Sequence, residues 1–302
     1  MKKVIAIVGP TASGKSSLAI SLAKKFNGEI LSVDSRQIYK GMDIGTAKEP
    51  GIWDEARQVL MVENIPHWGI NLVEPDAPYS VADFQTYARR IITEIFSRGH
   101  VPVLVGGTGL WLSAVIETYD LAHTAPDQEW RAAQAGKTAQ ELFEDYQKQD
   151  PEGAQKIDRF NARRLLRALE VIQQTGKSFF AQRQNREPLY DVLKIGLCPD
   201  RNTLYEWINT RVGFMMERGL VEEVRGLYHR YGCDLPSLSG IGYRQMCRFL
   251  QGEMTQEQAV EDIKKDTRHY AKRQWTWFKR DVGIHWIKTQ EEAEELVLSF
   301  LR

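Results

Sequence analysis

Short apolar runs recur along the chain, and most of them are separated by segments with helical periodicity. The runs that predict strands are Val4–Val8, Glu29–Val33, Val101–Val105, Val192–Leu197 and Gly283–Ile287. Apolar runs of this length suit strands that are buried on both faces, as in a parallel sheet. Strands that alternate with helices predict an α/β fold, in which a parallel sheet is flanked by helices.

The stretch from about 120 to 190 interrupts this alternation, because it contains no strand pattern. It predicts consecutive helices at Pro126–Gln134, Thr138–Gln149, Asn161–Thr175 and, more briefly, Ser178–Gln184. We therefore expect an all-helical insertion domain over 120–189 and a core domain formed by 1–119 and 190–302. The core segment after the insertion is mostly helical and closes with a helix over Glu291–Leu301.

The first strand runs directly into a loop with a glycine at each end. Glycine lets the backbone turn tightly, so that successive N–H groups point at phosphate oxygens. The helix from Ser16 to Phe26 adds its positive N-terminal end, Lys15 would bring a full charge, and Ser16 would offer a hydroxyl to Mg²⁺. The residues of this predicted phosphate loop are Gly9, Pro10, Thr11, Ala12, Ser13, Gly14, Lys15 and Ser16.

Two further loops are expected at the same edge of the sheet as the phosphate loop. Asp34 ends the second strand, where it could cap the next turn, hold a metal as in nucleotide hydrolases, or act as a general base. The third strand ends in Gly106-Gly107-Thr108-Gly109, which is either a tight turn capped by Thr108 or a loop that approaches a ligand closely. Ligands of open α/β sheets bind at this edge.

Composition and charge exclude few classes of protein. A chain of 302 residues predicts about two domains, and 40 basic residues balance 40 acidic ones. The three cysteines, Cys198, Cys233 and Cys247, lack metal-ligand spacing, so we expect neither a zinc site nor a disulfide framework. With no targeting or membrane-spanning pattern, the sequence predicts a cytoplasmic protein without a membrane partner.

Basic residues gather on two predicted helical faces. One face carries Arg159, Arg163 and Arg167 at four-residue steps. The other carries Lys264, Arg268, Lys272 and Lys279. Such stripes are often only solvated faces, but two of them in a neutral chain also fit contacts to a nucleic-acid phosphate backbone.

Seven segments resemble, in their order, the tRNA dimethylallyltransferases, which are also called tRNA isopentenyltransferases. They read GPTASGKS, DSRQIYKGMDIGTAK, YSVADF, GGTGLW, RRLLRALEV, GIGYRQM and TRHYAKRQWTWF. The resemblance extends from Val4 to about Ile287 and is most specific at Asp34–Lys48 and Tyr270–Phe278. The absence of a Cys/His zinc-finger extension makes the bacterial type the better match. It implies a P-loop NTPase-like core and a monomer.

The resemblance implies transfer of a dimethylallyl group from dimethylallyl diphosphate to N6 of adenosine 37, beside the anticodon, in tRNAs that read codons beginning with U. The phosphate loop and Mg²⁺ would then hold the diphosphate of the donor. Asp34 would match the general base of the family, and Thr11, Lys15 and Thr108 would match its residues at the reaction centre. The target base would have to be swung out of the anticodon loop to reach this site.

The resemblance also implies a set of tRNA contacts on both predicted domains. Gln37, beside Asp34, has the donor and acceptor that adenine recognition needs. The full set comprises Asp34, Ser35, Arg36, Gln37, Thr108, Arg131, Arg163, Arg164, Leu165, Leu166, Arg167, Ser239, Gly240, Ile241, Gly242, Tyr243 and Arg244.

Three other functions compete with this interpretation. A small-molecule or nucleotide kinase also begins with a phosphate loop and would need adenine and triphosphate recognition. An enzyme that prenylates free AMP would not need the basic insertion. A non-catalytic RNA-binding module would not need the Gly14-Lys15-Ser16 run together with Asp34 and Thr108.

Overall fold

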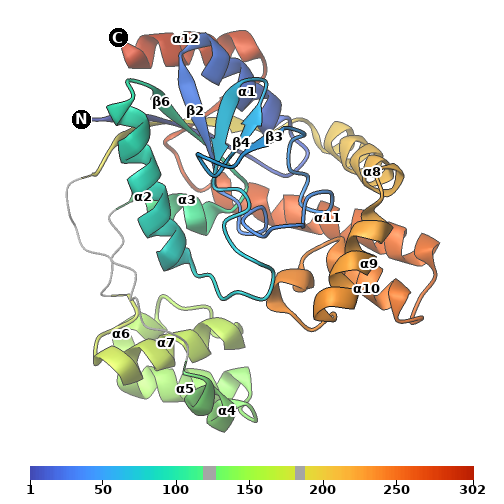
Figure 1. The fold of residues 1–302 in the computed structure, drawn as a ribbon. Helices are drawn as coiled ribbons and strands as arrows, with labels where there is room; N and C mark the ends of the chain where they lie inside the picture. The colour runs from blue at the N-terminus through green and yellow to red at the C-terminus, as the bar shows by residue number, and fades with distance from the viewer. Residues whose placement is uncertain (118–126, 181–187) are drawn as a thin grey trace. The chain divides into compact units, whose positions relative to one another are not determined.

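The computed structural model describes residues 1–117, 127–180 and 188–302, and Figure 1 draws the remaining segments in grey. The chain divides into two compact units, Met1–Ile116 with Leu189–Arg302 and Glu117–Pro188. The sequence predicts these two divisions slightly further along the chain, after residues 119 and 189. Pro126 and most of the predicted helix Ser178–Gln184 lie outside the described residues.

The larger unit is built on an eight-stranded sheet in the order β3-β4-β5-β2-β6-β1-β7-β8. All five predicted strands are present and parallel, and their ends differ from the prediction by no more than one residue. The predicted α/β class is therefore confirmed. The five strands are β1 (Lys3–Val8), β2 (Gly28–Ser32), β6 (Val101–Val105), β7 (Asp191–Leu197) and β8 (Ile284–Ile287).

Three strands were not predicted, namely β3 (Ile52–Asp54), β4 (Val59–Val62) and β5 (Ile65–Trp68). They form an antiparallel edge, and β5 then pairs in parallel with β2. β4 and β5 are joined by Glu63 and Asn64, which have φ of 51° and 65°. Two central residues with positive φ are the geometry of a tight hairpin, so Asn64 is the local signal that the prediction missed.

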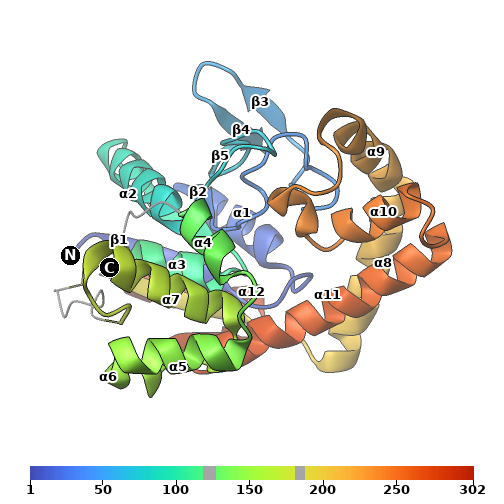
Figure 2. The same ribbon diagram turned by 90° about the horizontal axis from the view of Figure 1, so that it is seen from below.

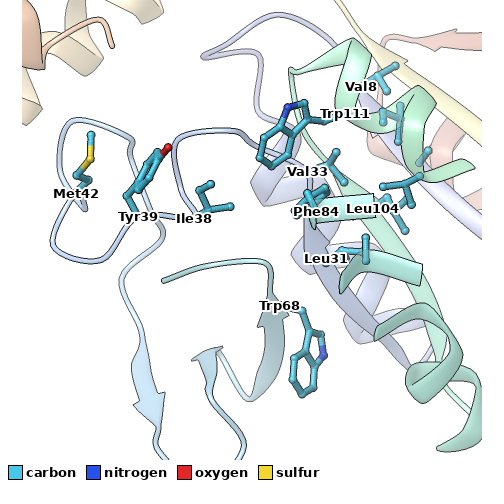
Figure 3. Close-up of a cluster of buried hydrophobic side chains, with 14 of the residues drawn as sticks. Val8, Leu31, Val33, Ile38, Tyr39, Met42, Trp68, Phe84, Leu104 and Trp111 are labelled. Atoms are coloured by element: carbon cyan, nitrogen blue, oxygen red, sulfur yellow. The ribbon is translucent and has the colours of Figure 1, made fainter. Parts of the chain in front are cut away.

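Alternate residues of the central strand β1 bury opposite faces of the sheet, as the pleat requires. Val4, Ala6 and Val8 join one core with α2 (Val81–Ser97) and α3 (Gly109–Ile116). Figure 3 shows part of this core, where Phe84 and Trp111 have ring centroids 4.5 Å apart. On the other face, Ile5 and Ile7 pack with α1 (Lys15–Lys25) and α12 (Gln290–Leu301), which lie together in Figure 1.

The other helices of the larger unit gather at one end of it, where Figure 2 shows the long α11 beside α8, α9 and α10. The helices are α8 (Arg201–Glu217), α9 (Leu220–Tyr231), η1 (Pro236–Ser239), α10 (Tyr243–Leu250) and α11 (Gln256–Phe278). No helix in the described ranges is both long enough and apolar enough to cross a membrane, the 23-residue α11 included.

A disulfide joins Cys233, after the end of α9, to Cys247 in α10. The expectation that the cysteines form no disulfide is therefore wrong. Their separation of 14 residues carries no signal in the sequence, because only the packing of α9 against α10 brings the two Cα atoms to 5.9 Å. Cys198 is free.

Helices are the only regular secondary structure in the described residues of the smaller unit, in agreement with the prediction. A capping box at Thr138 and Glu141 begins α5, and Asn161 caps α7. Its core includes Tyr146 and Leu169. The helices are α4 (Gln128–Gln134), α5 (Ala139–Gln149), α6 (Pro151–Ala154) and α7 (Ala162–Thr175).

Candidate functional site

The phosphate loop has the backbone that its sequence predicts. Gly9 and Gly14 have φ of 139° and 87°, and a Cβ on Gly9 would come within 2.2 Å of the Leu197 carbonyl oxygen. Gly14 caps α1 without any side-chain hydrogen bond, so the first N–H groups of the helix stay open to a ligand. The Ser13 hydroxyl is buried and has no hydrogen-bond partner among the described residues. The loop is therefore a cradle for an anion.

Lys15 lies in this loop with its ammonium donating a hydrogen bond to the Pro10 carbonyl. Burial and, to a smaller extent, the nearby Arg211 lower the pKa of Lys15 to about 7, while Asp34 opposes the change. Two cations with little solvent around them repel one another, so a bound anion would stabilise the charged form of both. The electrostatics of the site therefore favour a ligand with several negative charges.

Two adjoining cavities meet at Asp34. The phosphate lobe, about 320 Å³, is lined by the phosphate loop together with Gln37, Glu49 and Gly107. The second lobe, about 430 Å³, is lined by Ser35, the 239–244 segment and Thr108. Each has the size of a small-molecule site. The residues common to both lobes are Thr11, Asp34, Thr46, Arg211 and Tyr270.

Asp34 has one of the roles that its sequence position left open, and its second oxygen leaves room for another. Its Oδ1 accepts hydrogen bonds from the backbone N–H of Arg36 at 2.8 Å and of Gln37 at 3.4 Å, so it does cap the following turn. In the described part of the chain its Oδ2 makes no hydrogen bond, and the residue lines both lobes. Asp34 is thus oriented through one oxygen and can accept a proton at the other.

The Gly106–Gly109 loop lies close to the phosphate loop. Gln274 of α11 bridges the loops, since its Oε1 accepts from the Thr11 N–H at 2.7 Å and its Nε2 donates to the Gly107 carbonyl at 2.9 Å. The buried Thr108 hydroxyl has no hydrogen bond of good geometry within the described residues. Burial and the Asp34 charge raise the pKa of Tyr270 to about 12, and the nearby Thr108 hydroxyl lowers it in part.

Sequence reasoning missed Arg211, Tyr270 and Gln274 as site residues. All three come from helices, α8 and α11, that begin far along the chain from the phosphate loop. Burial lowers the pKa of Arg211, against the opposing effects of Glu49 and Asp34. One signal was available in the sequence, since Gln274 follows Tyr270 by four residues on the same side of a long predicted helix. A glutamine on the buried side of a helix needs hydrogen-bond partners, which indicates a polar site beside it.

Gln37 does not present a free amide to the cavity. Its Oε1 accepts from the Ser32 hydroxyl at 2.6 Å, and its Nε2 donates to the carbonyls of Thr46 at 3.2 Å and Ala47 at 3.3 Å. Both ends of the amide are therefore engaged in holding the loop after β2. In this arrangement Gln37 shapes the pocket instead of offering its donor and acceptor to a base.

The predicted contacts near residue 240 form one wall of the second lobe. Arg36 donates to the carbonyls of Pro236 and Ser237, both at 2.9 Å, and so ties the loop after β2 to this wall. Tyr243 is buried, and Arg244 pairs with Asp266 of α11. The structure thus brings together Ser35, Arg36, Thr108, Ser239, Gly240, Ile241, Gly242, Tyr243 and Arg244 around one cavity.

The residues of the smaller unit that are predicted to contact tRNA differ in exposure and in the partners of their side chains. Arg131 and Arg167 both bond to the buried Glu170 carboxylate, at 2.7 and 2.5 Å, so these arginines neutralise an internal charge. Arg163 and Arg164 are exposed, and the Arg164 guanidinium lies over the rings of Phe179 and Phe180. Leu165 is fully buried in the core of the unit, and Leu166 packs against that core.

Oxygen-bearing side chains surround the phosphate lobe, among them Ser16, Asp34 and Glu49. No cluster of three or more His, Cys, Asp or Glu side chains suited to a metal occurs in the ranges that the structure describes. Mg²⁺ usually keeps several waters and takes only one or two protein ligands beside substrate phosphates. The donor set fits a Mg²⁺ ion that arrives with a phosphorylated ligand.

Known proteins resemble the chain along nearly its whole length. The family model described as IPP transferase matches residues 37–281, and one described as isopentenyl transferase matches residues 2–52. The tRNA dimethylallyltransferase of Geobacillus thermodenitrificans is 44% identical, over 95% of this chain and 90% of the relative. That of Carboxydothermus hydrogenoformans is 44% identical over 98% and 95%.

Solved structures give the same result. The full-length tRNA isopentenylpyrophosphate transferase from Bacillus halodurans superposes with a TM-score of 0.73 at 39% identity, covering 100% of this chain and 97% of that one. A eukaryotic dimethylallyltransferase captured acting on tRNA superposes with a TM-score of 0.76 at 31% identity, covering 92% and 70%. The chain therefore belongs to the IPP transferase family.

Proposed function

We propose that this protein is a tRNA dimethylallyltransferase, which transfers the dimethylallyl group of dimethylallyl diphosphate to N6 of adenosine 37. The observation that carries the proposal is the position of Asp34, which lines a phosphate lobe and a second lobe at once. A reaction between a diphosphate and a base needs such a junction. The relatives described above are named for this activity.

The phosphate lobe would bind the donor. The N–H groups of the phosphate loop, Lys15 and Arg211 are set to receive the charge that develops as diphosphate leaves. Because these groups are fixed before the reaction, their reorientation costs little at the transition state. Mg²⁺, held by the Ser16 hydroxyl and the donor phosphates, would supply further charge stabilisation for the leaving group.

The second lobe would receive the adenine, swung out of the anticodon loop. The N6 amine is a weak nucleophile, because its lone pair is delocalised into the ring. As the C–N bond forms, Asp34 Oδ2 takes a proton from N6 while Oδ1 stays bonded to the Arg36 N–H. Thr108 and Tyr270 line this junction, where their hydroxyl groups can bond to the leaving oxygen.

A kinase is not favoured. A nucleotide kinase places an adenine and a triphosphate along the phosphate loop, whereas here the loop opens onto a lobe walled by Ser35, Arg36 and the 239–244 segment. The relatives are prenyltransferases by name.

The anticodon stem-loop is the proposed part of the tRNA that binds. The exposed Arg163 and Arg164 of α7 are the arginines of the smaller unit best able to contact its phosphates. We further propose that the enzyme acts as a cytoplasmic monomer on tRNAs that read codons beginning with U.

One assay tests the proposal. The protein is incubated with labelled dimethylallyl diphosphate, Mg²⁺ and either an anticodon stem-loop RNA or AMP, and label in each acceptor is measured. We expect transfer to the RNA and not to AMP. A parallel thermal-shift measurement compares dimethylallyl diphosphate with ATP, and stabilisation by ATP with no transfer to RNA would favour the kinase instead.

A further inference from the structure

The carboxylate of Glu223, in α9, holds the segment that forms one side of the second lobe. Its Oε2 accepts from the N–H groups of Asp43 at 2.9 Å and Ile44 at 2.7 Å, and its Oε1 accepts from that of Gly45 at 3.0 Å. Three successive backbone N–H groups thus converge on one carboxylate. This is the arrangement in which backbone amides bind an anion, here supplied by another part of the same chain.

The same carboxylate also reaches the wall formed by the 239–244 segment. The hydroxyl of Tyr243 donates to Glu223 Oε1 at 2.7 Å. Tyr243 is buried, and its pKa is raised well above its ordinary value by burial and by the Glu223 charge, so the phenol stays a donor. A Cβ on Gly45 would lie 2.5 Å from the Tyr243 ring, so the two walls touch at this point.

The segment that Glu223 holds continues directly into the reaction centre. Gly45 and Thr46 line the second lobe, and Thr46 lines the phosphate lobe as well. The Thr46 carbonyl accepts from Gln37 Nε2, and Gln37 follows Asp34 by three residues. A change at Glu223 would therefore alter the wall that faces the acceptor base. Among the described residues no hydrogen bond joins Glu223 to the phosphate loop.

We propose that Glu223 is a positioning residue for the acceptor base: its carboxylate fixes the 43–46 segment against Tyr243 and so sets the shape of the second lobe. The inference rests on the proposed function in one respect, that the second lobe receives an RNA base. Removing the carboxylate leaves three backbone donors and the phenol without their partner, and unsatisfied donors favour rearrangement of the segment.

The test uses Glu223→Ala and Glu223→Gln with Glu222→Ala as the matched control. Glu222 precedes it in the same helix, but its side chain is 69% exposed and, within the residues that the structure describes, pairs only with Arg225 at 3.6 Å. The measurements are KM for anticodon stem-loop RNA, kcat, the Kd for dimethylallyl diphosphate with Mg²⁺, and thermal unfolding of each variant.

For Glu223→Ala we expect KM for the RNA to rise about 10- to 100-fold. The donor Kd should stay within about twofold, and kcat should change less than KM. Glu223→Gln keeps one accepting oxygen and should fall between Ala and wild type. Tyr243→Phe, which removes only the hydroxyl, should raise the RNA KM in the same direction by less. Glu222→Ala should behave as wild type.

The inference is overturned if Glu223→Gln, folded by its melting curve, leaves the RNA KM unchanged. It is equally overturned if donor Kd and RNA KM rise together, because that indicates general loosening of the fold. Wild-type protein that does not prenylate RNA overturns the proposed function as well. Active wild type with insensitive Glu223 variants overturns this inference alone.

Discussion

The phosphate loop and the Asp34–Lys48 segment both follow a buried strand, yet they are held in place by different means. The loop takes its shape from its own glycines and from the helix that it begins. The segment consists of turns and a single bridge at Tyr39, and side-chain hydrogen bonds fix it, several of them to distant parts of the chain. Arg36 bonds to the 236–237 carbonyls, Glu223 holds residues 43–45, and the buried Lys48 reaches Tyr39, Asp43 and Asn71.

The difference separates two functions. A locally determined loop can bind the same diphosphate in many proteins, whatever surrounds it. A segment held from several elements forms a wall specific to one fold, and such a wall can select an acceptor. Substitutions in the loop should therefore act on the donor, and substitutions in the segment should act on the acceptor or on the reaction between the two.

The largest expected effect is at Asp34, which belongs to the segment but also lines the phosphate lobe. Asp34→Asn keeps an oxygen to cap the Arg36 N–H but cannot accept the N6 proton, so transfer should slow about 10²–10⁴-fold. Single-turnover assays measure the loss, and binding of donor and RNA should stay within a few-fold. A rate near that of wild type would leave Asp34 only its capping role.

Lys15→Ala should give the next largest effect and confine it to the donor side. Loss of a charge-assisted contact should weaken donor binding about 10- to 100-fold and slow the chemical step too, because the charge matters most as diphosphate departs. Separate titrations of donor and RNA are the measurement. Weaker RNA binding with unchanged donor affinity would reverse the assignment of the two regions.

The pH dependence of donor binding tests the same lysine without a large structural change. In the free protein the pKa of Lys15 is lowered from 10.5 to about 7, and a bound diphosphate favours the charged form and raises it. Above pH 7 binding then takes up a proton, so affinity should fall by up to about tenfold per pH unit. The slope should vanish in Lys15→Ala; a slope that persists there belongs to another group.

The smallest expected effect is on the salt dependence of RNA binding, in variants of the smaller unit. Arg163→Ala should lower the slope of log affinity for RNA against log salt by roughly 0.7–0.9, with the donor Kd as control. Arg167→Ala should in addition lower the melting temperature, because the buried Glu170 carboxylate loses one of its partners. Identical salt slopes for both variants and wild type would show that this face does not contact RNA phosphates.

The sequence predicted the parts of the site whose geometry is local. The glycine spacing after β1 predicted the phosphate loop. The position of Asp34 just after β2 predicted that it lies at the same edge of the sheet. The strands β3 to β5 were missed because they have three or four residues each, too few for a clear periodicity.

The long-range part of the site could not be predicted from local pattern. Gln274 is an ordinary helix residue until α11 packs beside the two glycine loops, and Cys233 meets Cys247 only after α9 packs on α10. Likewise, the sequence places Arg167 on a basic helical face and the resemblance gives Arg131 a tRNA contact, whereas in the structure both side chains bond to the buried Glu170. Partners distant in sequence decide these roles, and periodicity contains no information about them.

The order of the sheet has a consequence for association between molecules. Its edge strands in the described chain are β3 and β8, with three and four residues, whereas the long parallel strands are interior. An exposed edge is a template on which another chain can add a strand, and short edges offer few unpaired backbone groups for this. The β3 edge also ends in the charged Asp54. Addition of a strand from another molecule, and the aggregation that follows from it, is therefore disfavoured at this edge.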